Sequence, residues 1–187
     1  CIRDRSCETD RIMQIIRQAQ ARMHAAGSRQ WQDGYPAPGH ISADIGRSRG
    51  YVLCKPGVEG PLAVIAYGAV VFDGEPAYDA IDGQWLTDGP YVLVHRIAVA
   101  DGERGRGVAA EFLHRVEALA SERGVKAFRI DTNFDNRTML RLLERTGFSY
   151  CGKVVYRSGE RLAYEKQNPR LHSPGSFISL FSASLFS

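Results

Sequence analysis

The sequence lacks long apolar runs and an excess of charge of one sign. No apolar run reaches the roughly 20 residues that a membrane-spanning helix needs, so we expect no membrane partner. The first residues, CIRDRSCETDR, also lack the apolar core of a signal peptide. The net charge is +3, because 24 Lys and Arg residues are nearly balanced by 21 Asp and Glu residues. An excess this small and this scattered does not by itself argue for nucleic acid, and we expect no nucleic-acid partner.

The cysteines are few and are not arranged for metal binding. They show neither a CxxC pair nor the spacing to histidines that builds a metal site, and they are Cys1, Cys7, Cys54 and Cys151. We therefore expect no metal ion, reduced thiols and a cytoplasmic location. Because the sequence begins with Cys1 rather than Met, we also expect further residues upstream of it.

The length of 187 residues suits one well-packed domain, since a chain of this size buries roughly 70% of its unfolded surface. We predict a single domain over residues 1–167 and a separate tail, rich in Ser and apolar residues, over 168–187. Apolar residues of the tail fall at helical spacing, namely Phe177, Leu180, Phe181 and Leu185. This spacing predicts a helix whose apolar stripe packs on the domain or on a second copy of the chain, as in a homodimer.

The apolar periodicity predicts an α/β fold. The stretch TDRIMQIIRQAQARMHAAG predicts a helix with Thr9 as its N-cap and Gly27 as its stop, and a short helical piece follows at 41–45. GYVLCK, PLAVIAYGAVVF and YVLVHRIAVA predict strands, because β-branched and aromatic residues dominate them. The predicted order continues with a helix (107–123), a strand (125–131), a helix (135–146) and two strands, FSYCGKVVY and RLAYEK. We expect a mixed, mostly antiparallel central sheet flanked by helices.

The segment ERGRGVAAEFLHRV places two glycines and two arginines directly before the helix predicted at 107–123. Amides in the first turn of a helix have no intrahelical acceptor and lie at the positive end of the helix dipole, and glycines let a ligand approach the backbone. Arg104 and Arg106 add full charges, which suits a pyrophosphate better than a single carboxylate. A surface turn with solvated arginines is the alternative, but the position between a strand and a helix favours an anion site.

A dinucleotide is one ligand that fits this turn. Gly105, Gly107 and Ala110 match the pattern G-x-G-x-x-A, and Asp131 at the end of the next strand lies where a ribose-binding acid is expected. However, a polar loop separates the strand from the glycines, and too little chain follows Asp131 for the further parallel strands of such a domain. A nicotinamide or flavin enzyme is therefore the weaker hypothesis.

The stretch from Arg96 to Phe148 resembles the core of the GNAT N-acetyltransferase superfamily, whose signature is Q/R-x-x-G-x-G/A. Arg104, Gly107 and Ala109 stand at these three positions. The downstream family pattern, N-x-x-A-x-x-L-Y-x-x-x-G-F, is similar at identical spacing to Asn136, Met139, Leu142, Leu143, Gly147 and Phe148. QWQDGYP and GERLAYEK also resemble bacterial members of unassigned substrate, so the resemblance extends to about Gln167.

The resemblance implies acetyl-CoA as the co-substrate. Backbone groups of Ile97, Ala98 and Val99 would hold the pantetheine arm as if it were an added strand. Asn136 would approach the cofactor from the next helix, and helix capping is the alternative role for its side chain. The pyrophosphate would lie against the backbone amides of a continuous turn, which are those of Arg104, Gly105, Arg106, Gly107, Val108 and Ala109.

The sequence departs from the family at the general acid. Many members carry a tyrosine on the second helix that protonates the departing thiolate, and Leu143 occupies that position here. A thiol pKa of about 8.5 makes the thiolate a fair leaving group without assistance. Tyr150 on the next strand is a candidate substitute, and an ordinary half-buried strand aromatic is its alternative role.

An amine acceptor also needs a base, because an alkylamine with a pKa of about 10.4 is protonated at neutral pH. The candidates are His95 on the cofactor strand and Glu75 in the long loop before it, and the alternatives are a structural histidine and a solvent-facing carboxylate. We predict direct acetyl transfer to the primary amine of a small molecule or a peptide. The competing hypothesis is a non-catalytic acyl-CoA-binding or regulatory module, which the missing tyrosine keeps open.

Overall fold

The computed structural model describes residues 5–56, 62–167 and 179–182. These residues belong to two compact units. The first contains the described chain up to Val70, then Arg96–Phe112 and the short strand at 179–182; the second contains Val71–His95 and the described chain from Leu113 onward. The single domain over 1–167 and the separate tail remain predictions.

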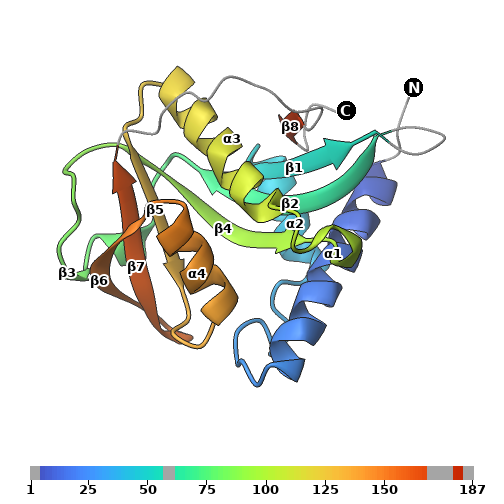
Figure 1. The fold of residues 1–187 in the computed structure, drawn as a ribbon, viewed down its shortest axis with the longest axis horizontal. Helices are drawn as coiled ribbons and strands as arrows, with labels where there is room; N and C mark the ends of the chain where they lie inside the picture. The colour runs from blue at the N-terminus through green and yellow to red at the C-terminus, as the bar shows by residue number, and fades with distance from the viewer. Residues whose placement is uncertain (1–4, 57–61, 168–178, 183–187) are drawn as a thin grey trace. The chain divides into compact units, whose positions relative to one another are not determined.

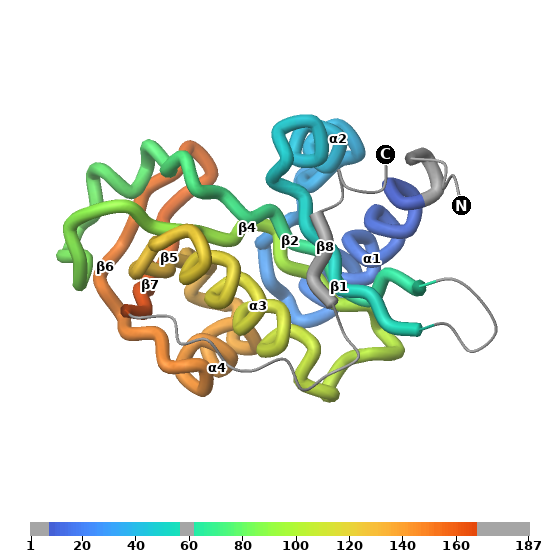
Figure 2. The backbone as a smooth tube through the Cα atoms, turned by 90° about the horizontal axis from the view of Figure 1, so that it is seen from above, coloured from blue at the N-terminus to red at the C-terminus, as the bar shows by residue number. Residues whose placement is uncertain are grey.

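The first unit packs two helices on a β-hairpin. Its elements are α1 (Arg5–Ala25), α2 (Pro38–Gly46), β1 (Gly50–Lys55), β2 (Ala63–Val71) and the second half of β4 (Tyr91–Val99). The strands β1 and β2 pair antiparallel from Gly50↔Ala69 to Lys55↔Ala63. Figure 2 shows α1 and α2 beside these two strands.

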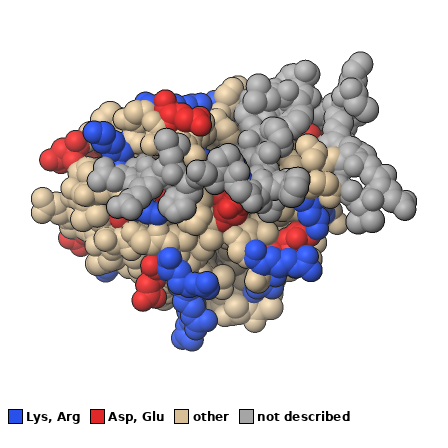
Figure 3. Space-filling model, turned by 45° about the horizontal axis from the view of Figure 1, so that its top comes forward, with Lys and Arg blue, Asp and Glu red and all other residues tan. Residues whose placement is uncertain are grey.

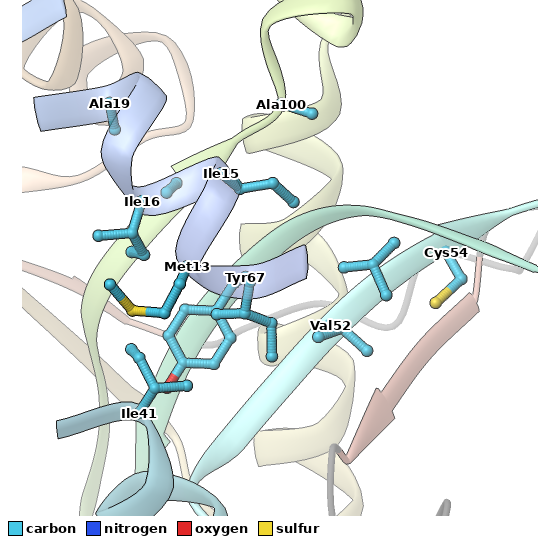
Figure 4. Close-up of a cluster of buried hydrophobic side chains, with 12 residues drawn as sticks. Met13, Ile15, Ile16, Ala19, Ile41, Val52, Cys54, Tyr67 and Ala100 are labelled. Carbon is cyan, nitrogen blue, oxygen red and sulfur yellow. The ribbon is translucent and has the colours of Figure 1, made fainter. Parts of the chain in front are cut away.

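A buried apolar cluster joins these elements. Ile12 and Ile16 of α1, Ile41 of α2 and Tyr67 of β2 are all fully buried in it. In Figure 4 the labelled side chains of Ile41 and Tyr67 lie beside each other, and the hydroxyl of Tyr67 points toward α2. The predicted first helix is confirmed, and Ile12, Ile15, Ile16 and Ala19 form its core-facing side. The helix begins at Arg5 rather than after Thr9, and Gly27 follows its end in the left-handed conformation (φ 73°) that glycine adopts without strain.

The predicted helix in the tail is wrong where the structure describes it. Ser179–Ser182 is a strand, β8, which pairs antiparallel with β1 from Cys54↔Ser179 to Tyr51↔Ser182 (Figure 1). Backbone pairing with the open edge of β1 satisfies hydrogen-bonding groups on both segments, and this outweighs the helical spacing of the apolar residues. The other two residues of the predicted stripe, Phe177 and Leu185, lie outside the described residues.

The second unit carries most of the sheet. Its elements are the 3-10 helix η1 (Pro76–Tyr78), β3 (Asp82–Gly83), the first half of β4, β5 (Ala127–Thr132), α4 (Arg137–Arg145), β6 (Ser149–Tyr156) and β7 (Gly159–Gln167). The strands lie in the order β4-β5-β7-β6-β3. β4 and β5 are parallel and the other pairs are antiparallel, which confirms the predicted mixed sheet.

Two elements run from one unit into the other. Helix α3 (Val108–Glu122) follows a short 3-10 helix, η2 (Asp101–Glu103), and connects β4 to β5. The predicted strand–helix–strand unit is thus present. Strand β4 pairs in parallel with β5 over Tyr91–Leu93 only, although it continues to Val99. Arg96, within β4, has a left-handed backbone (φ 57°), which is strained for a residue with a side chain.

Among the described residues, no helix combines the length and the apolar character needed to cross a membrane.

Candidate active site

The glycine-rich turn is exposed and opens helix α3. Gly105 (φ 73°) and Gly107 (φ 78°) are both left-handed, and a Cβ atom on either would meet no atom within 4 Å. Among the described residues, no backbone oxygen accepts a hydrogen bond from the amides of Gly105, Arg106 or Gly107. The turn therefore presents amide donors to solvent at a helix N-terminus, as an anion site requires.

The two arginines of this turn differ in their surroundings. Arg106 Nη1 lies 3.5 Å from the carboxylate of Glu103, which also pairs with Lys55. Both Arg104 and Arg106 are exposed to solvent. Part of the positive charge of Arg106 is thus already compensated, and Arg104 is the residue that matches the family signature.

The predicted cofactor strand has ordinary core packing on its side chains. Ala98 is buried in the apolar cluster of the first unit, whereas Ile97 and Val99 are half-buried. The carbonyl oxygen of Val99 accepts a hydrogen bond from Arg22 (3.2 Å). The proposed role of this strand needs only backbone groups, and it remains a prediction.

Three residues that bear on the family resemblance lie in the second unit. Asn136 caps α4, because its Oδ1 accepts from the amide of Met139 (3.1 Å), and a role toward the cofactor remains a prediction. Leu143 is fully buried in the core. Tyr150 on β6 is 55% exposed rather than half-buried, and its ring packs edge-on against Tyr164. Its proposed acid role is untested by this geometry.

The two candidate bases, His95 and Glu75, lie together in the second unit. The Nε2 atom of His95 is 3.1 Å from Glu75 Oε2, and both side chains are about one-fifth exposed (20% and 23%). Glu75 is positioned as the N-cap of η1, where its Oε1 accepts from the amide of Ala77, and its own amide donates to the hydroxyl of Tyr91 (3.0 Å). The loop before β4 therefore holds the carboxylate against the histidine.

Asp131 completes this cluster from β5. Its Oδ2 accepts hydrogen bonds from the hydroxyls of Tyr78 (2.8 Å) and Tyr156 (3.0 Å), and it lies 3.9 Å from His95 Nδ1. Burial, and then the charge of Asp131, raise the pKa of both tyrosines well above the usual value. Both hydroxyls therefore remain protonated donors. We refer to Glu75, His95, Asp131, Tyr78 and Tyr156 as the histidine cluster.

The sequence interpretation missed Asp131 as a member of this cluster and weighed it only as a ribose-binding acid. Its two hydrogen bonds to tyrosine hydroxyls tie it to the histidine cluster instead. One signal was available, because β5 reads AFRIDT and alternates charged residues with the buried Phe128 and Ile130. A charged residue inside an otherwise buried strand calls for a specific partner. Which residues pair with Asp131 could be known only from the fold.

Arg96, which follows His95, belongs to a different polar cluster, in the first unit. Its guanidinium binds the carboxylate of Asp44 through two nitrogens (2.5 and 2.8 Å) and donates to the hydroxyl of Tyr35 (2.7 Å). Tyr67 also donates to Asp44 (2.7 Å). Burial lowers the pKa of Arg96 by itself, but Tyr35 and Asp44 outweigh it and raise the pKa above the usual value. We refer to Arg96, Asp44, Tyr67 and Tyr35 as the arginine cluster.

Two further features bear on ligand binding. The second unit has an open hollow bordered by Phe134, Lys153, Glu160, Arg161 and Leu162, and none of the predicted site residues lines it. In the part of the chain that the structure describes, no group of three or more Cys, His, Asp and Glu side chains is arranged to hold a metal ion.

Comparisons with known proteins agree with the resemblance seen in the sequence. The model of the acetyltransferase (GNAT) family matches residues 15–148. A GNAT-family acetyltransferase from Streptococcus agalactiae 2603 is 40% identical, with 86% of this chain and 90% of that chain covered and a TM-score of 0.74. No curated protein matches the chain.

More distant solved structures share the fold. A putative acetyltransferase from Staphylococcus aureus Mu50 is 24% identical, with coverage of 86% and 92% and a TM-score of 0.60. The NatC complex bound to Gag peptide and CoA is 13% identical, with coverage of 82% and 91% and a TM-score of 0.56. The family model spans most of the chain and the streptococcal relative covers nearly all of it, so the chain belongs to the GNAT family of acetyltransferases.

Proposed function

We propose that this protein transfers an acetyl group from acetyl-CoA directly to the primary amine of a small molecule or a peptide. The contact between His95 Nε2 and Glu75 Oε2 is the observation that carries this proposal, because amine acetylation needs a base and this pair provides one. Membership of the GNAT family supports acyl transfer in general.

The hydrogen bond to Glu75 selects the basic atom of His95. A carboxylate only accepts hydrogen bonds, so Nε2 carries the hydrogen and Nδ1 keeps its lone pair. Asp131 Oδ2, at 3.9 Å, is too far from Nδ1 for a hydrogen bond. Nδ1 is therefore the atom that accepts the proton from the acceptor ammonium, directly or through one water molecule. The neutral amine that remains has the lone pair needed for attack.

The charge of the histidine cluster favours a cationic acceptor. Glu75 and Asp131 both pair with His95, and the raised pKa values of Tyr78 and Tyr156 keep these side chains neutral. The two carboxylates outnumber the single histidine, so the cluster carries a net negative charge whether the ring is neutral or protonated. A negative, partly buried site attracts an ammonium group and disfavours anionic acceptors.

The glycine-rich turn suits acetyl-CoA, the donor of the acetyl group. Unpaired amides at the start of α3, left-handed glycines and Arg104 would hold a pyrophosphate. When bound, acetyl-CoA supplies a thioester whose C–S bond breaks as the acetyl group passes to the amine nitrogen. Acidic and basic side chains are interspersed on the face drawn in Figure 3.

The buried Leu143 provides no acid for the departing thiolate. We propose that the thiolate leaves unprotonated, which its ordinary pKa of about 8.5 allows near neutral pH. The exposed Tyr150 is the other candidate, and a falling rate at alkaline pH that Tyr150→Phe abolishes would identify it as the acid.

A screen of primary amines tests the proposed function. Thiol release from acetyl-CoA is measured with diamines, amino acids, aminoglycosides and peptide N-termini, and the acetylated product is identified by mass. We expect release that depends on a cationic amine. Tight binding of acetyl-CoA with no release for any amine would instead favour the non-catalytic acyl-CoA-binding module.

The donor site is tested by Gly107→Val. A β-branched residue at φ 78° is strained, so the backbone of the turn would have to change and would no longer present the same amides, and we expect calorimetric affinity for acetyl-CoA to be lost. Gly124→Val is the matched control, because Gly124 is also left-handed (φ 70°) in open surroundings but follows the end of α3. Unchanged affinity in Gly107→Val would contradict the assignment.

A further inference from the structure

The carboxylate of Asp131 lies at the junction of the histidine cluster. Its side chain is only 9% exposed, and one oxygen, Oδ2, both accepts the two tyrosine hydroxyls and faces His95 Nδ1. A buried carboxylate is costly unless hydrogen bonds and a positive charge compensate it. Tyr78 and Tyr156 supply the hydrogen bonds. A protonated His95, whose Nδ1 lies 3.9 Å from Oδ2, can supply a positive charge.

We propose that Asp131 is a positioning residue for acetyl transfer, whose carboxylate stabilises the proton gained by His95 Nδ1 while Tyr78 and Tyr156 hold that carboxylate in place. This inference rests on the proposed function, in which Nδ1 accepts the proton of the ammonium. The proton moves from the ammonium nitrogen to Nδ1, and the ring becomes positive 3.9 Å from a fixed negative charge. A charge that is already in place needs no reorganisation when the proton arrives.

The tyrosines give Asp131 a fixed orientation. Tyr78 belongs to η1, the turn that Glu75 caps, and its ring stacks on Tyr91 while its carbonyl accepts from Trp85 Nε1 (3.0 Å). The bond from Tyr78 to Asp131 therefore connects the turn that holds Glu75 with β5. Tyr156 adds a second bond from β6. Glu75 and Asp131 are thereby held against the two nitrogens of one ring.

The titratable groups that face His95 come from two elements. Glu75 faces Nε2 from the loop before η1, and Asp131 faces Nδ1 from β5. Tyr78 and Tyr156 act through Asp131, and Arg161 on β7 acts on Tyr156. Since both direct neighbours are carboxylates, removal of either charge makes protonation of the ring less favourable.

Asp131→Asn tests the proposal, because asparagine keeps the shape and an accepting oxygen but removes the charge. With a cationic amine as acceptor, we expect kcat to fall about threefold to tenfold while KM changes less than about twofold. We also expect the midpoint of the rise of kcat with pH to move down by about one unit. Tyr156→Phe should shift the midpoint in the same direction by less. Asp88→Asn, which removes an exposed charge from the preceding loop, is the control and should change neither value.

A measurement without substrate separates this inference from the proposed function. The titration of His95 is followed by nitrogen NMR of 15N-histidine-labelled protein, with His95→Gln used to assign the signal. We expect the midpoint to move to lower pH in Asp131→Asn and less so in Tyr156→Phe. An unchanged midpoint in both variants would overturn the role of Asp131. Failure of the native protein to acetylate any amine would overturn the proposed function, whatever the NMR titration shows.

Discussion

Two neighbouring residues of β4, His95 and Arg96, belong to polar clusters of opposite design. In the arginine cluster, one guanidinium meets one carboxylate through two hydrogen bonds, and two tyrosines complete the contacts. In the histidine cluster, two carboxylates lie against one histidine. Glu75 is within hydrogen-bond distance of Nε2, whereas Asp131 lies near Nδ1 without forming a hydrogen bond. The first cluster is balanced in charge, whereas the second is negative.

The difference indicates what each cluster does. An ion pair whose charges balance and whose hydrogen bonds are made is not suited to take up a proton or bind a cation. Here the pair holds Arg96 in a left-handed conformation that costs about 1–3 kcal/mol when unsupported. An unbalanced cluster with a titratable ring can take up a proton and attract a cation. We infer that the arginine cluster fixes the path of β4 and that the histidine cluster performs the chemistry.

The largest expected effect is on stability, in the arginine cluster. Asp44→Ala leaves the guanidinium of Arg96 without its carboxylate and the hydroxyl of Tyr67 without its acceptor, at a site where Asp44 is only 5% exposed. Removing one partner of a buried ion pair typically costs about 3–5 kcal/mol of unfolding free energy. Urea denaturation measures this loss, and a change below about 1 kcal/mol would show that the pair is not structural.

The second largest expected effect is on the catalytic rate and concerns the histidine cluster. Glu75→Gln keeps an oxygen that can cap η1 but lets the amide donate to Nε2, which would place the hydrogen of the neutral ring on Nδ1. We expect kcat to fall at least about tenfold, with an unfolding free energy within about 1 kcal/mol of the native protein. Steady-state kinetics and denaturation of the same preparation check both. A loss of stability at unchanged kcat would reverse the assignment of the two clusters.

The smallest effect concerns alkaline stability and involves both clusters. Burial and a neighbouring carboxylate, Asp44 for Tyr67 and Asp131 for Tyr156, raise the pKa of these tyrosines above the usual value. The unfolded chain loses the tyrosine protons above about pH 10 while the folded protein keeps them, so stability is present below that pH and falls above it. Each tyrosine contributes a slope of about 1.4 kcal/mol per pH unit. Replacing either tyrosine with Phe should reduce the measured slope of unfolding free energy against pH. An unaltered slope would contradict the raised pKa of that tyrosine.

Much of the fold follows from local patterns. Five elements lie within a few residues of their predicted bounds, namely strands β1, β2 and β4 and helices α3 and α4. Their apolar periodicity agrees with their tertiary environment. The tail shows the limit of this reasoning. Its apolar spacing favours a helix, but the edge of β1 is a long-range feature that no local pattern reveals, and Ser179–Ser182 pairs with it.

The site could be predicted only in part, for a similar reason. His95 and Glu75 were selected for their chemistry. They are 20 positions apart in the sequence, and nothing in the sequence indicated that their side chains lie 3.1 Å apart. Asp131 required the parallel pairing of β4 with β5 to be placed beside His95. The left-handed backbone of the glycine-rich turn was predictable, because Gly105 and Gly107 adopt this conformation without strain, whereas its binding of a pyrophosphate remains a prediction.

The dependence of kcat on pH for the native protein and for His95→Gln is the sharpest test of His95 as the base. With a saturating cationic amine, we expect a native kcat that rises with pH and then reaches a plateau, because one base must lose its proton and Leu143 provides no opposing acid. We expect His95→Gln to lose this rise and to fall on the order of a hundredfold in kcat. A His95→Gln variant that keeps both the native rate and the native profile would show that the histidine is structural and would contradict its role as the base.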